Sequence, residues 1–368
     1  MAIQCARKGA LHPWKNHGAA RLAMTKEIVR PAMTENTPNP LDFWRSLSPA
    51  FDPAAPTIPA FDTPEAEFRA AAAGKTVLAP LPHLAVLEIS GDDARNFMQG
   101  QFTQDLRPLQ AGVARYAAWC SAKGRMLANF LVAPLPDTEP GAEKRFYLIL
   151  AADLVEATLK RLPMFVLRAK VRIAAVPSLV LGLAGEETNA ALQALGWDTP
   201  PAPAAAQDAT PEATLTFSPD GLVRIRLPEA SPRFLLLLPP EKGAEIWPRL
   251  AAAVQPVGTA LWQGLDVRAG FPWITAATRE AFVPQMANFA PLGVSFKKGC
   301  YTGQEVVARA QYLGKVKRHL YRLASPIPLA PGETLHSPDC ADQPDSSAGI
   351  VVTAAPDADG YAALAVLL

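Results

Sequence analysis

The chain has 368 residues, of which 49% are hydrophobic and 19% charged, and its formal net charge is +1. This composition is typical of a globular protein, and the length predicts two or three domains rather than one. A near-zero net charge excludes a global electrostatic attraction to nucleic acid, and the sequence lacks the apolar run of about 18 residues that a transmembrane helix needs. We therefore expect no nucleic acid and no membrane among the partners.

The N-terminal part of the chain predicts an extension rather than a domain. Residues 1–26 carry five cations and no acid, which indicates either an over-long start or disordered tail, the interpretation we favour, or a mitochondrial targeting segment. Residues 31–64 are dense in proline and predict an extended lead-in, interrupted by one short helix at residues 41–45. We expect ordered structure to begin near Lys75, with residues 1–74 as a partly disordered extension.

The order of apolar strands and helical stretches predicts an α+β fold in three parts. A first α+β domain covers residues 75–178 and returns with 256–315, and a second covers 179–255. The two share a coarse pattern, which is consistent with an internal duplication. Short strands between Pro, Gly and Asp turns over residues 316–368 predict a small C-terminal β-barrel or β-sandwich, and we favour the barrel.

The cysteines give no sign of a disulfide framework or a metal site. Cys5, Cys120, Cys300 and Cys340 are far apart, and the five histidines are equally scattered. No spacing matches a set of metal ligands, so we predict no structural metal. Isolated thiols favour a reducing compartment such as a bacterial-type cytoplasm.

Cys300 lies in the run Lys-Gly-Cys-Tyr-Thr-Gly-Gln-Glu, residues 298–305. Thr302 and Glu305 have the spacing of a capping box before a helical apolar stretch, so we expect a helix N-terminus about one turn after the cysteine. Free backbone N–H groups, the helix dipole and the neighbouring Lys298 all favour a thiolate. Cys300 is therefore either a reactive nucleophile or a half-buried cysteine in a Gly-flanked turn.

Several separated motifs resemble those of the YgfZ-type folate-binding proteins, which are accessory factors for iron–sulfur proteins and relatives of the glycine-cleavage T protein. The cysteine run is the most specific of them. The others are Met-Gln-Gly-Gln at 98–101, Ala-Lys-Gly-Arg-Met at 122–126, Ala-Gly-Phe-Pro at 269–272 and Phe-Val-Pro-Gln at 282–285. The resemblance covers roughly residues 84–323. It implies two ferredoxin-like α/β units and a small barrel around a central folate-sized opening.

The resemblance also implies a binding site for tetrahydrofolate or a derivative. Trp262 falls where the family has a folate-contacting tryptophan, whereas Leu84 replaces a second aromatic residue. Asn129 falls where T proteins carry a catalytic carboxylate. Arg125 of the hairpin and Gln304 of the cysteine run complete the folate-binding candidates. Taken alone, Trp262 is more simply a core aromatic, and Arg125 a solvated charge.

These features predict a tetrahydrofolate-binding accessory protein that assembles or repairs iron–sulfur clusters in client enzymes, using Cys300 with Lys298 and Tyr301 beside it. Its expected partners are folate and iron–sulfur client or assembly proteins. An asparagine at position 129 cannot act as a carboxylate base, which disfavours the alternative of a folate-dependent aminomethyl or one-carbon transferase. A third interpretation is a folate-binding module without chemistry, in which the cysteine turn is architectural and Tyr301 packs in the core.

Overall fold

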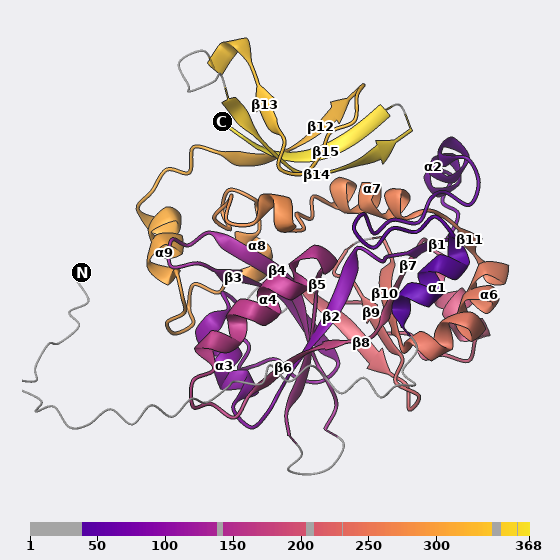
Figure 1. Ribbon diagram of the computed structural model, residues 1–368, viewed down its shortest axis with the longest axis horizontal. Helices are drawn as coiled ribbons and strands as arrows, with labels where there is room; N and C mark the ends of the chain where they lie inside the picture. The colour runs from indigo at the N-terminus through magenta and orange to yellow at the C-terminus, as the bar shows by residue number, and fades with distance from the viewer. Residues whose placement is uncertain (1–38, 138–142, 204–209, 230, 341–346, 359) are drawn as a thin grey trace, which may run out of the picture.

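Figure 1 shows a computed structural model of the chain, which describes residues 39–137, 143–203, 210–229, 231–340, 347–358 and 360–368. Residues 1–26, the predicted tail or targeting segment, lie outside this part of the chain. Within the described ranges, every helix is too short or too polar to span a bilayer.

One continuous mixed sheet runs through most of the molecule. Its eleven strands have the order β11-β1-β7-β10-β9-β8-β3-β4-β5-β2-β6. All neighbours are antiparallel except β1 and β11, which are parallel. The strands are β1 (Val77–Pro80), β2 (Leu84–Ser90), β3 (Val113–Cys120), β4 (Met126–Pro134), β5 (Arg145–Ala151), β6 (Arg172–Val176), β7 (Leu179–Ala184), β8 (Glu212–Phe217), β9 (Val223–Arg226), β10 (Arg233–Leu238) and β11 (Gln255–Pro256).

The strand order repeats within this sheet. The first half has the order β6-β2-β5-β4-β3 and the second β1-β7-β10-β9-β8, and the halves join through β3 and β8, where Val113 lies opposite Thr214. The predicted duplication is thus present in the strand order. The two α+β units are halves of one sheet, and the ferredoxin-like detail is not confirmed. Strand β1, which we expected in the first unit, lies between β11 and β7 in the second half.

Helices cover the sheet and separate it from the C-terminal part of the chain. Helix α7 lies between the large sheet and the C-terminal sheet, and α9 lies at one edge of the molecule (Figure 1). After the two N-terminal helices, the helices are α3 (Ala94–Gln101), α4 (Val155–Arg161), α5 (Thr188–Ala194), α6 (Gly243–Ala253), α7 (Thr259–Ala269), α8 (Ala290–Gly293) and α9 (Gln304–Tyr312).

The core lies on both faces of the second half-sheet. Successive side chains of a strand point to opposite faces, so Leu235 and Leu237 of β10 join the main hydrophobic cluster, whereas Leu236 and Leu238 join a second one beneath α6. Because both faces are covered, β10 is a continuous apolar run rather than an alternating one.

Two helices precede β1, so the prediction that ordered structure begins near Lys75 is wrong for residues 39–74. Helix α1 (Pro40–Leu47) confirms the short helix expected at 41–45, and α2 (Pro64–Ala72) follows it. Trp44 of α1 is buried in the second cluster. The carboxylate of Glu67 accepts hydrogen bonds from the backbone N–H groups of Phe61 (2.6 Å) and Gly258 (2.8 Å), which ties α2 to the start of α7.

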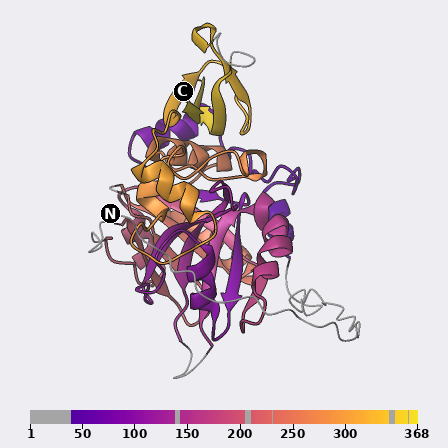
Figure 2. The same ribbon diagram turned by 90° about the vertical axis from the view of Figure 1, so that its left-hand side faces the viewer.

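The C-terminal residues form a four-stranded antiparallel sheet of order β12-β15-β14-β13. Its strands are β12 (His319–Ser325), β13 (Thr334–His336), β14 (Ser347–Asp357) and β15 (Gly360–Leu367). Strands β12 and β13 are its two edges and do not pair with each other in the described residues, so a closed β-barrel is not confirmed. Val352, Leu364 and Val366 are part of the main hydrophobic core. Figure 2 shows this sheet at the top of the molecule, beyond the layer of α7.

Candidate functional site

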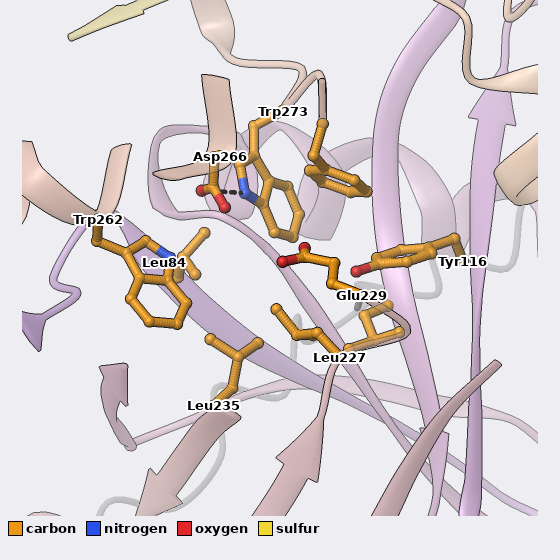
Figure 3. A pocket seen from close by; sticks show the side chains of 10 residues that line it. Leu84, Tyr116, Leu227, Glu229, Leu235, Trp262, Asp266 and Trp273 are labelled. Carbon is orange, nitrogen blue, oxygen red and sulfur yellow. Dashed lines mark hydrogen bonds between the residues drawn. The ribbon is translucent and has the colours of Figure 1, made fainter. Parts of the chain in front are cut away.

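An apolar pocket lies at the centre of the large sheet, against α7. Its free volume is only about 10 Å³, room for about one water molecule, and both half-sheets contribute to its wall. Two predicted folate-binding residues, Trp262 and Leu84, lie together in this wall (Figure 3). The full lining is Leu84, Tyr116, Leu131, Leu227, Glu229, Leu235, Trp262, Asp266, Phe271 and Trp273. We refer to it as the inner pocket.

The indole of Trp262 is enclosed in a slot. On one side Gly182 of β7 leaves the room that the ring occupies, because a side chain there would collide with the indole carbons. Against its face lies the guanidinium of Arg233, 4.3 Å from the ring centroid. Such contacts favour a fixed ring, and Trp262 is only 1% exposed. Trp262 therefore lines the inner pocket while Arg233 already covers a face of its ring.

A buried charge network lies beside this slot. Arg233 donates to both carboxylate oxygens of Glu229 (3.0 Å each) and to Oδ1 of Asp266 (2.5 Å). The indole N–H of Trp273 donates to the other oxygen of Asp266 (3.2 Å), as Figure 3 shows. One cation between two carboxylates leaves a net negative charge. Removal of the cation or of the carboxylates would leave an uncompensated buried charge, which is strongly destabilising.

The network changes the protonation of its members. Burial raises the pKa of Glu229 and of Asp266, and Arg233 opposes that rise in both. Burial alone lowers the pKa of Arg233, but the two carboxylates outweigh it and the net shift is upward. In Figure 3 the Glu229 carboxylate points into the space between Leu84 and Tyr116. The carboxyl groups of Glu229 and Asp266 thus line a pocket whose other side chains are mostly apolar.

A larger outer pocket continues from the inner one. It has a volume of about 430 Å³ and shares Leu84, Asp266 and Trp273 with the inner pocket. The remaining lining comes from three separate parts of the chain: the N-terminal segment at 54–57, the large sheet and α7, and the C-terminal sheet at Thr353 and Ala354. The two pockets together form a central opening bordered by all three parts of the fold. Their combined size is in the range of small-molecule sites.

The outer pocket is mostly apolar with a few polar side chains, and none of the described residues that line it is a lysine or arginine. Asp153 lines it, with Oδ2 accepting the backbone N–H of Ala276 at 2.9 Å. His83 lines it as well, and neither of its buried ring nitrogens has a hydrogen-bond partner among the described residues. Burial lowers the pKa of His83 to about 4, so the ring is neutral at pH 7.

Two other predicted folate-binding residues lie away from these pockets and bind backbone. The side-chain amide of Asn129 donates to the carbonyl of Pro272 (3.0 Å) and accepts the N–H of Ile274 (2.9 Å), which holds the segment after α7 against β4. Arg125 donates to the carbonyl of Ala281. Neither residue lines the inner or the outer pocket.

The cysteine turn, residues 298–305, is a second candidate site that is separate from the two pockets. Cys300 is exposed, whereas Tyr301 is buried next to it. Burial, with a smaller contribution from the charge of Cys120, raises the pKa of the Tyr301 phenol. Gln304 is the first residue of α9, and its N–H donates to the carbonyl of Tyr301 (3.2 Å). None of these residues lines the central opening.

The expected capping box is wrong. The N-cap of α9 is Gly303 with φ +82°, and neither Thr302 nor Glu305 makes a side-chain cap. Gly303 is required because a Cβ there would collide with the carbonyl oxygen of Ser121 and lie 3.0 Å from Cα of Gly124. The start of α9 is therefore set by close backbone packing between the cysteine turn and the hairpin, and not by a hydroxyl cap.

Lys298 does not extend toward solvent beside the thiol. Its ammonium donates to the carbonyls of Gln99 (2.6 Å), Phe102 (2.5 Å) and Gln104 (3.1 Å), at the C-terminal end of α3. Burial lowers its pKa to about 8, whereas the nearby charge of Asp105 raises it. The three carbonyl acceptors and the negative end of the helix dipole hold the proton on the amine. Lys298 thus fastens the cysteine turn to α3.

Sequence reasoning missed the charge network. Asp266 lies four residues after Trp262 on one helix, so helical spacing places it on the same face and was a usable signal. Glu229 and Arg233 carried no comparable signal, because they lie in and beside a loop whose position depends on the tertiary fold.

Comparison with known proteins identifies the family. A family model described as the GCVT N-terminal domain matches residues 38–290. A protein of Yersinia pseudotuberculosis serotype O:1b (strain IP 31758) named tRNA-modifying protein YgfZ is 36% identical over 263 residues, which cover 70% of this chain and 74% of that protein. This chain belongs to the YgfZ family. A protein of the same name from Sodalis glossinidius (strain morsitans) is 36% identical over 270 residues, 72% of this chain and 74% of that one.

A solved structure agrees on the fold. The crystal structure of glycine cleavage system aminomethyltransferase T from Bartonella henselae matches with a TM-score of 0.65, over 80% of this chain and 78% of that chain. At 18% sequence identity, this match shows the fold alone. The YgfZ-family chain therefore has the aminomethyltransferase-like fold, a large mixed sheet with a small antiparallel sheet, and the predicted resemblance is confirmed.

Proposed function

We propose that this protein binds a tetrahydrofolate in the central opening and acts as an accessory factor for iron–sulfur enzymes, with Cys300 as its reactive group. The observation that carries the folate part is the meeting of Trp262 and Leu84 with the Glu229 carboxylate in one apolar pocket. The name of the relatives adds tRNA modification. Client enzymes that modify tRNA with the help of an iron–sulfur cluster fit both descriptions, without nucleic acid as a direct partner.

The inner pocket suits a reduced pterin ring chemically. Such a ring has two apolar faces and an edge with several N–H donors, and the Glu229 carboxyl group, held by Arg233, supplies an acceptor for that edge. The ring's faces would pack against Leu84 and the edge of Trp262. The inner pocket alone has only about 10 Å³ of free space, so a ring enters it only if the lining side chains move, and the rest of the folate lies in the outer pocket of about 430 Å³.

The cysteine turn supports an accessory role rather than folate chemistry. Cys300 is exposed and does not line either pocket, so a partner protein reaches its sulfur more readily than a bound folate does. One cysteine supplies one of the usual four cluster ligands, so any cluster contact is shared with a client. Unpaired Cys120, Cys300 and Cys340 fit a reducing cytoplasm.

Asn129 supports this function over an aminomethyl transferase. Both ends of its amide are engaged with the backbone of residues 272–274, so the position that we compared with a catalytic carboxylate has a structural contact here. An amide also lacks the charge that general-base catalysis needs.

Calorimetric titration with tetrahydrofolate tests the binding site. We expect Glu229→Gln, which keeps the side-chain shape, to weaken binding about tenfold through loss of a charge-assisted hydrogen bond. Trp262→Ala should weaken it at least as much. Trp197→Ala is the matched control, because Trp197 also lies near an arginine, 6.0 Å from Arg224, but away from the pocket. Equal affinities for all four proteins would refute the site.

Complementation of a deletion strain tests the cysteine. We expect Cys300→Ala to fold and bind folate normally but to fail in restoring the activity of iron–sulfur enzymes, including those that modify tRNA. Full restoration by Cys300→Ala would leave a folate-binding module in which the cysteine turn is architectural.

A further inference from the structure

A groove of about 500 Å³ lies between α9 and the segment that leads from α9 to β12. Its floor is aliphatic and includes Val283, Met286, Val306 and Val316. Figure 2 shows α9 on the face turned toward the viewer, below the C-terminal sheet. The groove is distinct from the central opening, because the two share no lining residue.

The rim of this groove is strongly basic. Arg309, Lys315, Lys317 and Arg318 line it, and no aspartate or glutamate is among its described lining residues. In the described part of the chain none of these four cations forms an ion pair. Glu305, four residues before Arg309 on α9, forms no ion pair with it there either. The groove thus carries four unpaired cations, a local positive charge that the net charge of +1 for the whole chain does not reveal.

Apolar surface continues beyond the groove at the end of α9. Leu313 is 85% exposed and Tyr312 67% exposed, so neither side chain contributes to the hydrophobic core. Exposed apolar groups next to a hollowed, charged rim are typical of a protein-binding surface rather than of ordinary solvated helix.

The chemistry of the lining decides the kind of partner. Single-stranded nucleic acid is bound by tracking cations together with aromatic platforms for the bases. The described lining of this groove has cations but no aromatic side chain, and its floor is aliphatic. Tyr312 lies beside the groove rather than in it, with its ring edge-on to Phe296 at 5.8 Å between centroids. An amphipathic peptide segment fits both features, since its apolar face covers such a floor and acidic side chains meet the rim.

We propose that this groove docks an acidic amphipathic segment of a client protein. The inference deepens the proposed accessory function, on which its link to Cys300 rests. Val306 of the floor lies six residues after Cys300, so the two are at most about 21 Å apart by chain length. A segment bound in the groove therefore brings its own protein within reach of the exposed sulfur.

Binding of defined peptides tests the groove. The probes are an 18-residue helical peptide with leucines on one face and glutamates elsewhere, the same peptide with lysines in place of glutamates, and an unmodified tRNA transcript. Fluorescence anisotropy with the full chain should show binding of the acidic peptide at least tenfold tighter than of the basic one. Added salt should weaken it.

Charge reversal locates the site. Lys315→Glu/Lys317→Glu should weaken the acidic peptide at least tenfold and leave folate affinity unchanged. The matched control is Arg69→Glu/Lys75→Glu, the same change in charge at and after α2, which lies at the other end of the molecule from α9 (Figure 1). The control should change peptide affinity less than twofold.

Three results would overturn the proposal: equal binding of the acidic and basic peptides, no effect of the groove variant, or tRNA binding that the groove variant abolishes while the acidic peptide does not bind. Cys300→Ala should still bind the acidic peptide, so failure of the groove and failure of the cysteine hypothesis are separate outcomes.

A proximity measurement completes the test. The acidic peptide carrying a terminal cysteine activated as a pyridyl disulfide exchanges with Cys300, whose thiolate takes the peptide sulfur and releases pyridinethione. Docking raises the local concentration of the disulfide, so the exchange should be at least tenfold faster than with a short unbound pyridyl disulfide. Equal rates, or equal acceleration in the groove variant, would contradict docking beside Cys300.

Discussion

At the scale of single residues, neighbours in one motif have unrelated environments. Cys300 is exposed, Tyr301 is buried, and Lys298 is 6% exposed with its ammonium on three carbonyls. The sequence grouped them as one catalytic set because they are adjacent. In the fold, Lys298 and Tyr301 anchor the turn from beneath, and the thiol is what remains accessible.

Replacement of Lys298 tests this anchoring. Lys298→Met removes the donor from three carbonyls and keeps much of the side-chain volume, so we expect the free energy of unfolding to fall by about 2–4 kcal/mol. The exposed neighbour Lys297 gives the control, Lys297→Met, with a change within about 0.5 kcal/mol. Urea unfolding measures both. Equal stability of the two variants would show that the ammonium contributes nothing to holding the turn.

The neutral, buried His83 predicts a specific loss of stability in acid. Its folded pKa of about 4 lies below the unfolded value of 6.5. Between these values the unfolded chain binds more protons, so stability rises with pH from 4 to 6.5 and is lost as pH falls. Wild type should lose about 3 kcal/mol more than His83→Leu between pH 7 and pH 4, as measured by urea unfolding. A gap that is constant with pH would contradict a neutral buried ring.

At the scale of elements, close contact between backbone segments determines where α9 begins, which the helix-capping preferences of its residues did not predict. Helix α9 begins at a glycine in the left-handed region, where the sequence suggested a threonine cap. The hairpin between β3 and β4 approaches this point from the other side, and Gly124 has φ +68° with no room for a Cβ beside Val306. Two glycines from distant segments thus form one contact between the hairpin and the cysteine turn.

The two glycines of the cysteine motif provide a matched pair for testing that contact. Gly303→Ala forces strain at positive φ and a collision with Ser121, and should cost about 2 kcal/mol or more of folding free energy. Gly299→Ala meets no atom within 4 Å and should cost less than about 1 kcal/mol. Thermal unfolding compares them, and equal losses would argue against the packed turn.

At the scale of the whole molecule, the three parts share one core around the central opening. The two half-sheets are continuous through β3 and β8, and the C-terminal sheet contributes Val352, Leu364 and Val366 to the same hydrophobic cluster. A fold of this kind should unfold as a unit, because no part buries its apolar face alone.

Leu364→Ala tests that coupling. All seven tryptophans of the sequence precede residue 316, so their fluorescence reports only on the parts outside the C-terminal sheet. Leu364 is 2% exposed, and its truncation should cost about 3 kcal/mol. We expect the tryptophan transition in urea to shift together with the far-UV circular dichroism. An unchanged tryptophan transition would mean that the C-terminal sheet unfolds independently.

The sequence by itself determined the family, the α+β class, most of the strands and helices, and the candidates Cys300 and Trp262. These features follow from local periodicity and from motifs whose residues are close together in the chain. Tertiary structure decided what depends on contacts between distant segments. It joined the two units into one sheet and gave residues 39–74 a defined structure. It also brought Glu229, Arg233 and Asp266 into one network and buried the ammonium of Lys298 against backbone carbonyls. A local pattern specifies an element, but a buried charge or a missing Cβ has meaning only beside the partner that the fold brings to it.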